Sequence, residues 1–128
     1  MRGLMQDRLL TIPALVSRVD QNFGHKRIIT GGTTETVSTW AEVVPRVRRL
    51  ARALDALGVA ADACVGTFAW NSQRHVELYL AIPSAGRVLH TINHRLHREQ
   101  VTFIVNDAAD DILFVGRTML QVVWPLLS

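Results

Sequence analysis

The stretch that decides the fold is CVGTFAWNSQRHVELYLAIPSAGRVLHTIN, residues 64–93. An apolar run at 64–69 predicts a buried strand, and a second apolar run at 88–93 predicts another. Between them the sequence predicts a helix over 73–85, which Asn71 or Ser72 begins and Gly86 closes. The strands are continuous apolar runs, which is typical of strands that are covered on both faces. The stretch therefore predicts two parallel strands joined by a helix.

The same alternation continues on both sides of this stretch. Upstream, Thr39 and Glu42 have the spacing of a capping box and predict the start of an amphipathic helix that ends at Gly58, with Pro45 near its beginning. Downstream, the pattern predicts a helix over 98–109, a strand over 112–115 and an apolar helix over 119–127 that Thr118 caps. From residue 40 onward the order predicts an α/β fold with mostly parallel strands and helices on both faces.

The N-terminal part departs from this alternation. Thr11 and Pro13 predict the start of a helix whose apolar stripe ends at Phe23, and we expect Gly24 to stop it in the left-handed conformation. The β-branched residues of 27–30 and 35–38 flank Gly31 and Gly32, which predicts a short hairpin.

Composition restricts the classes of protein that need to be considered. The chain has 128 residues, of which 48% are hydrophobic and 20% charged, and a formal net charge of +3. One small globular domain fits these values, and the single cysteine, Cys64, excludes an intrachain disulfide. We expect no transmembrane segment, because no apolar run reaches about 18 residues. The N-terminus also lacks the apolar core of a signal peptide, which predicts a cytoplasmic protein.

Arginine dominates the basic residues, with 13 arginines against one lysine. The densest group, at positions 46, 48, 49 and 52, shares its helix with Glu42 and Asp55. Glu42 and Arg46 have the spacing of a favourable helix pair. We therefore interpret the group as a solvated helix face and expect no nucleic-acid partner.

The familiar phosphate and metal motifs are missing from the sequence. Residues 30–34, TGGTT, are rich in glycine and threonine but have no lysine after them, so a hairpin turn explains them better than a phosphate loop. His90, His94 and His97 are close in sequence, yet the predicted strand and loop need not bring them together, and no cysteine pair accompanies them.

Nucleophiles and acids give no catalytic arrangement either. Cys64 lies in an apolar run, and Ser72 and Ser84 lie at helix ends, where capping explains them. The nearby acids Asp107, Asp110 and Asp111 are interpreted as a helix end and a turn.

Trp70 and Asn71 are more informative, because they follow a buried strand directly. Open α/β sheets bind ligands at the carboxyl ends of their strands, so this corner is a candidate binding site. The alternative, which we favour, is that Asn71 caps the next helix and Trp70 packs in the core or at an interface.

Six segments in register carry a resemblance to a known family. They are STWAEV (38–43), RLA to LGV (49–59), FAWNS with ELYLA (68–81), GRVLHTIN with Arg95-Leu96 (86–96), EQV to NDA (99–108) and ILFV (112–115). Together they resemble the N-terminal part of adenylate-forming enzymes, and within that superfamily medium- or long-chain fatty-acid–CoA ligases. One departure is Ala61-Asp62, where the family usually has Gly-Asp.

The resemblance implies a reaction that needs more than these residues. Family members activate a carboxylate with ATP and Mg²⁺ to an acyl-adenylate, which then reacts with CoA. The family's ATP-phosphate loop, magnesium-binding element, ribose-binding aspartate and catalytic lysine all lie further along. The resemblance therefore places no catalytic, cofactor-binding or metal-binding residue on this chain, and no cofactor is expected for the chain alone. We expect residues 1–128 to be the N-terminal portion of an AMP-binding domain, truncated before the ATP-phosphate loop and catalytically inactive.

Two alternatives remain open. The chain could be a stand-alone, non-catalytic binding or interaction module of this fold; an independently active small enzyme is the least favoured hypothesis. The mean hydropathy of +0.17 is high for a small domain. It favours a partner for an apolar face, either the remainder of the enzyme or a second copy of the chain, while a fatty acid is implied only for the full-length enzyme.

Overall fold

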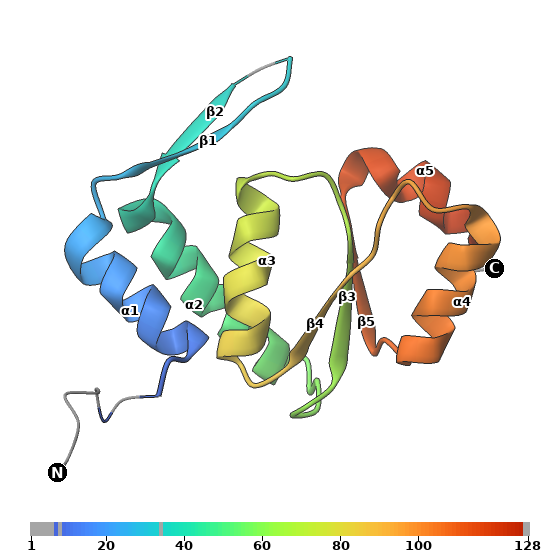
Figure 1. Cartoon of the computed structure of the whole chain (residues 1–128), viewed down its shortest axis with the longest axis horizontal. Helices are drawn as coiled ribbons and strands as arrows, with labels where there is room; N and C mark the ends of the chain where they lie inside the picture. Colours follow the sequence, from blue (N-terminus) through green and yellow to red (C-terminus); the bar gives the residue numbers. More distant parts are fainter. Residues whose placement is uncertain (1–6, 8, 34, 127–128) are drawn as a thin grey trace, which may run out of the picture.

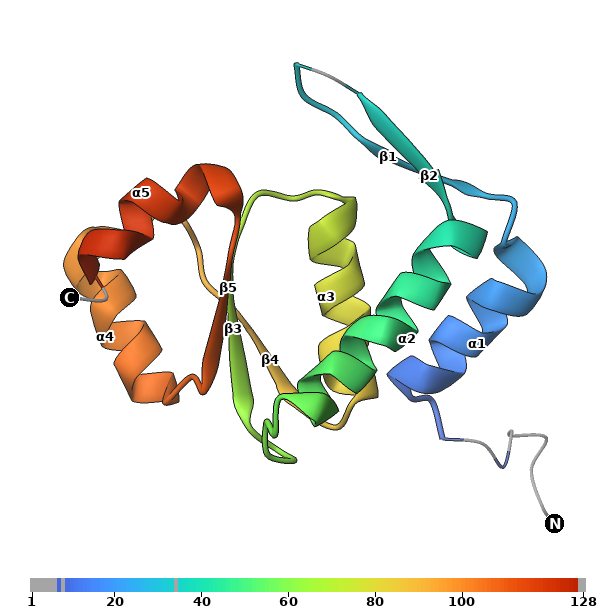
Figure 2. The same cartoon turned by 180° about the vertical axis from the view of Figure 1, so that it is seen from behind.

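The chain forms a three-stranded parallel sheet between two layers of helices, with a separate hairpin beyond one layer (Figures 1 and 2). The computed structural model describes residues 7, 9–33 and 35–126. Its elements, in chain order, are α1 (Ile12–Phe23), β1 (Arg27–Thr30), β2 (Thr36–Thr39), α2 (Trp40–Ala56), β3 (Cys64–Phe68), α3 (Gln73–Ser84), β4 (Val88–Thr91), α4 (Arg98–Ala108), β5 (Ile112–Val115), the 3₁₀ turn η1 (Arg117–Met119), α5 (Leu120–Val123) and the 3₁₀ turn η2 (Trp124–Leu126). The predicted α/β fold with a short N-terminal hairpin is confirmed.

The sheet has the strand order β4-β3-β5, with all strands parallel. In its register Gly66 of β3 lies opposite His90 of β4 on one side and Leu113 of β5 on the other. Helix α3 connects β3 to β4 over one face, and α4 connects β4 to β5 over the opposite face (Figure 1). The direction along the sheet reverses between these two connections, so right-handed crossovers place their helices on opposite faces.

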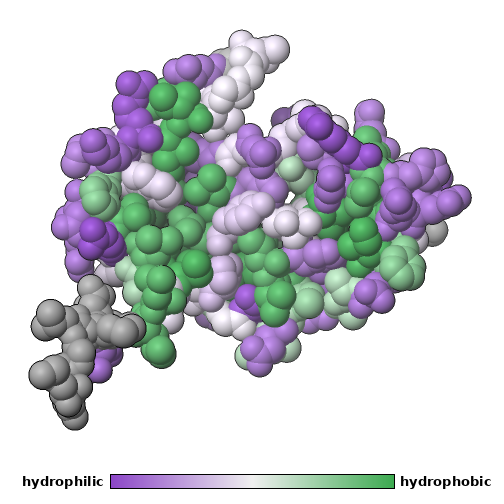
Figure 3. Space-filling view, in the orientation of Figure 1, coloured by the Kyte–Doolittle hydropathy of each residue, from purple (hydrophilic) through white to green (hydrophobic). Residues whose placement is uncertain are grey.

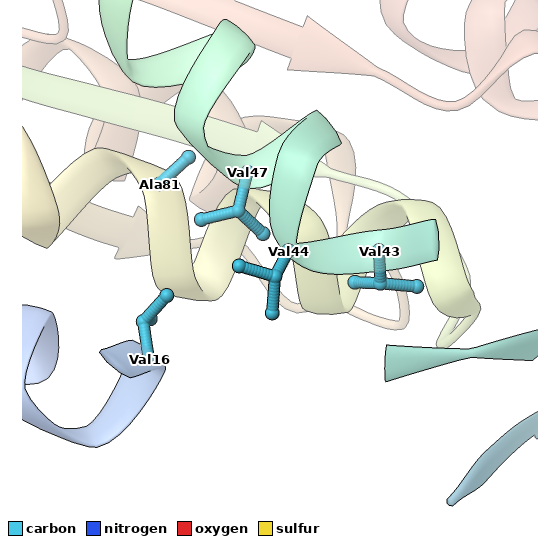
Figure 4. Packing of buried hydrophobic residues seen from close by; sticks show 5 residues of the cluster. All are labelled: Val16, Val43, Val44, Val47 and Ala81. Carbon is cyan, nitrogen blue, oxygen red and sulfur yellow. The ribbon is translucent and has the colours of Figure 1, made fainter. Parts of the chain in front are cut away.

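Three clusters of buried side chains hold the layers together. The first joins α1, α2 and α3 (Figure 4), and its members are Val16, Val43, Val44, Val47 and Ala81. The second lies between the sheet and the α2–α3 layer, and its members are Leu54, Val59, Val65, Leu78 and Ile82. The third lies between the sheet and the α4–α5 layer, and its members are Phe68, Ile92, Val101, Met119 and Val123. The sheet is therefore covered on both faces, as its continuous apolar strands predict.

The start signals of α1 and α2 form as the sequence predicts. Thr11 accepts a hydrogen bond from the Ala14 N–H at 3.3 Å. The Glu42 carboxylate accepts from the Thr39 N–H at 2.7 Å and from the Thr39 hydroxyl at 3.0 Å. These hydrogen bonds to the charged form, the backbone one above all, lower the pKa of Glu42.

Two predictions about the helix ends are wrong. Gly24 does not adopt the left-handed conformation but stays helical, with φ of −50°. Its carbonyl accepts from the Ala41 N–H at 2.9 Å, so the end of α1 is fixed by the start of α2. Thr118 does not cap a helix over 119–127, because it lies inside η1 and the apolar segment after it divides into α5 and η2. Residues 127 and 128 lie outside the described residues.

The hairpin is tied to the helices by a buried polar network. The Ser38 hydroxyl donates to Gln73 Oε1 at 2.5 Å, and Gln73 Nε2 donates to Glu77 Oε1 at 2.7 Å. Arg46 Nε donates to the same Glu77 oxygen at 2.7 Å. The predicted solvated face is therefore correct for the exposed arginines 48, 49 and 52 but not for Arg46, which a carboxylate from α3 holds in a half-buried position.

Candidate functional site

A cavity of about 460 Å³ opens at the carboxyl ends of β3 and β5. Trp70 borders it where β3 ends, Arg74 and His75 border it from the first turns of α3, and Phe114 and Arg117 border it from β5 and η1. This volume lies within the range of about 300–1,000 Å³ that is usual for small-molecule sites. The location is the edge of a parallel sheet at which α/β proteins bind ligands.

Local backbone contacts bring these elements together. The Ser72 hydroxyl accepts from the His75 N–H at 3.4 Å and begins α3 beside the end of β3. On the other side, the Gly116 N–H donates to the Phe68 carbonyl at 2.9 Å. A Cβ on residue 116 would lie 3.3 Å from both Cα and Cβ of Ala69, so the glycine allows the two strand ends to approach closely.

The structure decides between the alternatives for the corner at Trp70 and Asn71 only in part, and packing of Trp70 at an interface stays a prediction. Ser72 and not Asn71 caps α3. Trp70 is 52% exposed and so does not pack in the core. Its ring contacts the His94 ring, and the two ring centroids lie 4.2 Å apart. The competing interpretation of this corner as a binding site stays a hypothesis.

His75 forms a buried polar wall of the cavity. Its Nε2 lies 3.0 Å from the Thr67 hydroxyl, and its ring centroid lies 4.9 Å from that of Tyr79. Its Nδ1 has no partner with good hydrogen-bond geometry in the described part of the chain, although the Trp70 backbone lies close enough to act on the ring. Burial lowers the pKa of His75, and the Trp70 backbone opposes this shift only in part. The imidazole is therefore neutral near pH 7.

The three histidines that are close in sequence do not converge. His90 contacts Asp110, His94 contacts Trp70, and His97 begins α4, where its N–H donates to Gln100. Among the described residues, no group of three or more His, Cys, Asp or Glu could hold a metal ion.

His90 and Asp110 form a pair that the sequence does not reveal. His90 Nδ1 lies 2.8 Å from Asp110 Oδ2, and the Asp110 side chain is only 1% exposed. The Asp110 carboxylate lies directly against Gly66, where a Cβ would be 2.7 Å from Asp110 Oδ2. Asp110 is thus more than a turn residue, whereas Asp107 lies in the last turn of α4 and Asp111 begins the link to β5, both exposed as expected. The separation of twenty positions between the partners explains why no local pattern indicates the contact.

The other candidates have structural roles. Thr30 ends β1, and its hydroxyl accepts from the Gln73 N–H at 2.8 Å, which positions the hairpin against α3. Residue 34 of the glycine- and threonine-rich segment lies outside the described residues. Cys64 is the half-buried first residue of β3. Ser84 is the last residue of α3, and its buried hydroxyl has no hydrogen-bond partner among the described residues, so the prediction that it caps the helix is wrong.

The glycine- and threonine-rich segment does not have the arrangement of a nucleotide phosphate loop. The segment at 30–34 leads into β2 and not into a helix, and the chain's one lysine, Lys26, precedes β1. The prediction that the chain holds no catalytic, cofactor-binding or metal-binding residue of its own stays a prediction. No helix among the described residues is long and apolar enough to cross a membrane.

Comparison with known proteins assigns the chain to a family. Residues 13–125 match the model of the AMP-binding enzyme family. The chain is 39% identical over 125 residues to 3-methylmercaptopropionyl-CoA ligase of Ruegeria lacuscaerulensis, and 38% identical over 125 residues to medium-chain-fatty-acid–CoA ligase of Ectopseudomonas oleovorans. Each match covers 96% of this chain and 23% of the relative.

A solved structure confirms the fold. Mycobacterium tuberculosis fatty acyl CoA synthetase superposes with a TM-score of 0.82 at 23% sequence identity, over 94% of this chain and 24% of the other. The chain thus spans about a quarter of the length of the proteins that it matches, and corresponds to the N-terminal part of acyl-CoA ligases. With a family match over residues 13–125, the chain belongs to the AMP-binding enzyme family.

Proposed function

We propose that this chain acts as the N-terminal segment of an ATP-dependent acyl-CoA ligase, in which it supplies a scaffold and not the reacting groups. The observation that carries the proposal is the identity of 38–39% to two acyl-CoA ligases over 96% of the chain. Fatty acids are the proposed substrates of the whole enzyme, with ATP, Mg²⁺ and CoA as its further reactants. The proposed location is the cytoplasm, which cell fractionation tests.

The scaffold role is supported by what the chain lacks and by what it builds. The sequence has none of the family's ATP-binding motifs, whereas the two core clusters on either face of the sheet are well formed. Catalysis of acyl transfer needs donors and cations arranged around developing phosphate charge. We therefore expect the chain alone to give no ATP–pyrophosphate exchange with any fatty acid.

A chimeric enzyme tests this function. The matching segment of the Ectopseudomonas oleovorans ligase is replaced with this chain, and ATP–pyrophosphate exchange with octanoate is measured for the chimera and for the isolated chain. The chimera should retain exchange, and the isolated chain should show none. A matched chimera carrying Leu54→Asp, which places a charge at a fully buried position, should lose exchange.

Two results would contradict the proposal. A chimera that unfolds cooperatively but gives no exchange excludes the scaffold role. Exchange by the isolated chain shows that the chain is itself catalytic.

A second candidate, a stand-alone interaction module, is favoured by the exposed apolar surface (Figure 3). Phe103 is 68% exposed, Val122 54% and Trp124 69%, all in the α4–α5 layer. Apolar patches of this kind are typical of surfaces that bind another protein, and a stand-alone module would bind a different protein through this one. Light scattering after size exclusion distinguishes the candidates, because a monomer with a cooperative thermal transition favours the module, and self-association favours the scaffold segment.

A further inference from the structure

The cavity beside Trp70 has an unbalanced charge. Arg74 and Arg117 both line it, and no aspartate or glutamate is among its lining residues in the part of the chain that the structure describes. The Arg74 side chain is 76% exposed, and its ion pair with Glu77 is long at 3.5 Å. Glu77 already accepts from Arg46 and from Gln73 at 2.7 Å each. Arg117 is exposed and has no acceptor among the described residues.

The helix dipole makes this end of the cavity suitable for a negative charge, whereas His75 adds no charge there. The cavity includes the first turn of the twelve-residue helix α3, where the helix dipole is positive. His75 is neutral near pH 7 because burial lowers its pKa. The positive charge is therefore carried by the two guanidinium groups, which pair well with planar anions.

The rest of the cavity is apolar and partly aromatic. The Trp70 residue is about half exposed, and the His94 ring contacts its ring. Phe114 and Leu78 provide apolar wall on the side of the sheet and of α3. Aromatic rings favour offset or tilted contacts with other rings, so a flat apolar body fits this wall.

We propose that this cavity is a binding site for a small aromatic monoanion, whose ring lies against Trp70 and whose charge faces Arg74 and Arg117. The ligand is recognised as an anion with a flat body and not as a carboxylic acid to be activated. The site goes beyond the proposed ligase function and needs neither ATP nor the remainder of an enzyme.

The test is a titration of the whole chain with naphthalene-2-sulfonate, followed by NMR. The chain has three tryptophans, so the indole N–H signal of Trp70 is identified by its loss in Trp70→Phe, and Trp40 and Trp124, which do not line the cavity, serve as internal controls. For a ligand of this size we expect a dissociation constant of about 1 mM or tighter. Naphthalene-2-sulfonamide, of the same shape but neutral, should bind about tenfold more weakly.

Matched variants separate charge from shape. Arg117→Ala and Arg74→Ala should each weaken sulfonate binding by about tenfold, whereas Arg49→Ala, an exposed arginine on α2, should leave it unchanged. Thr118→Trp places a bulky group at an exposed rim position and should abolish binding without altering the core.

The proposal is overturned if the sulfonamide binds as tightly as the sulfonate, if neither cavity arginine matters, or if the Trp70 signal does not move. All three outcomes are independent of the exchange assay, so this proposal and the ligase proposal can fail separately.

Discussion

Replacing Gly66 with alanine tests the packing at the middle of the sheet. A methyl group there would lie 2.7 Å from Asp110 Oδ2 and 2.8 Å from Leu113 Cδ1, both inside van der Waals contact. The Asp110 carboxylate cannot move easily into solvent, because its side chain is 1% exposed and His90 Nδ1 holds it at 2.8 Å. The methyl group must therefore displace the His90–Asp110 contact, the leucine or the strand.

Two opposing contributions set the size of the effect. Overpacking in a core costs about 1–3 kcal/mol. Alanine also lowers the conformational entropy of the unfolded chain. Where the native backbone conformation suits alanine, this effect stabilises the folded state by about 0.4–1 kcal/mol. We expect Gly66→Ala to lower the free energy of unfolding by about 1–2 kcal/mol. Urea unfolding followed by circular dichroism at pH 7 measures it.

A double-mutant cycle identifies the cause. In an Asp110→Ala background the methyl group meets no carboxylate, so the cost of Gly66→Ala should fall by about 1 kcal/mol. Gly31→Ala, with no atom within 4 Å of the added Cβ, is the control and should change stability by less than about 0.5 kcal/mol. A neutral Gly66→Ala, or an equal cost in both backgrounds, refutes the assigned contact.

Three other substitutions probe separate parts of the fold. Leu54→Ala, at a fully buried side chain, should lower the free energy of unfolding in urea by about 2–5 kcal/mol. Leu57→Ala, at a side chain 70% exposed, is the control and should lower it by less than about 0.5 kcal/mol. Equal losses would contradict the assigned core. Arg87→Met removes a buried guanidinium that donates to Asp55 and to two carbonyls, and should cost about 1.5–3 kcal/mol in thermal unfolding. If Arg87→Met lowers the thermal stability no more than Asp55→Asn does, the hydrogen bonds of Arg87 to the two carbonyls contribute nothing to stability. Burial lowers the pKa of His75 in the folded chain. Below pH 6.5 the unfolded chain therefore binds a proton at this residue more readily than the folded chain does, and the free energy of unfolding decreases as the pH falls below that value. His75→Asn should flatten this fall in urea unfolding between pH 7.5 and 5, and parallel curves for the two proteins would exclude the assignment.

Local signals predicted the elements well. Thr11, Thr39 and Ser72 all begin helices, and Gly58 and Gly86 follow helix ends with φ of 74° and 72°, because caps and left-handed turns depend on a few neighbouring residues. The strand at 112–115 was predicted with its observed bounds, and the second hairpin strand begins one residue later than predicted.

Features that depend on distant contacts were not predicted. Arg46 reaches Glu77 across 31 positions, and a local pattern offers the nearer Glu42 instead. In the cavity, the sequence indicated Trp70 because it follows a strand. It could not indicate Arg117, because this residue joins the cavity only once β5 pairs with β3. Strand order is a property of the tertiary structure, and neither hydrophobic period nor turn residues specify it.

The strand order has a consequence for synthesis on the ribosome. The middle strand, β3, is the first of the three to emerge, and β4 and β5 follow on its two sides. At about 5–20 residues per second, each later strand can add to a neighbour that already exists, and none has to insert between two strands that have paired. The nascent sheet can therefore form in the order in which its strands are made.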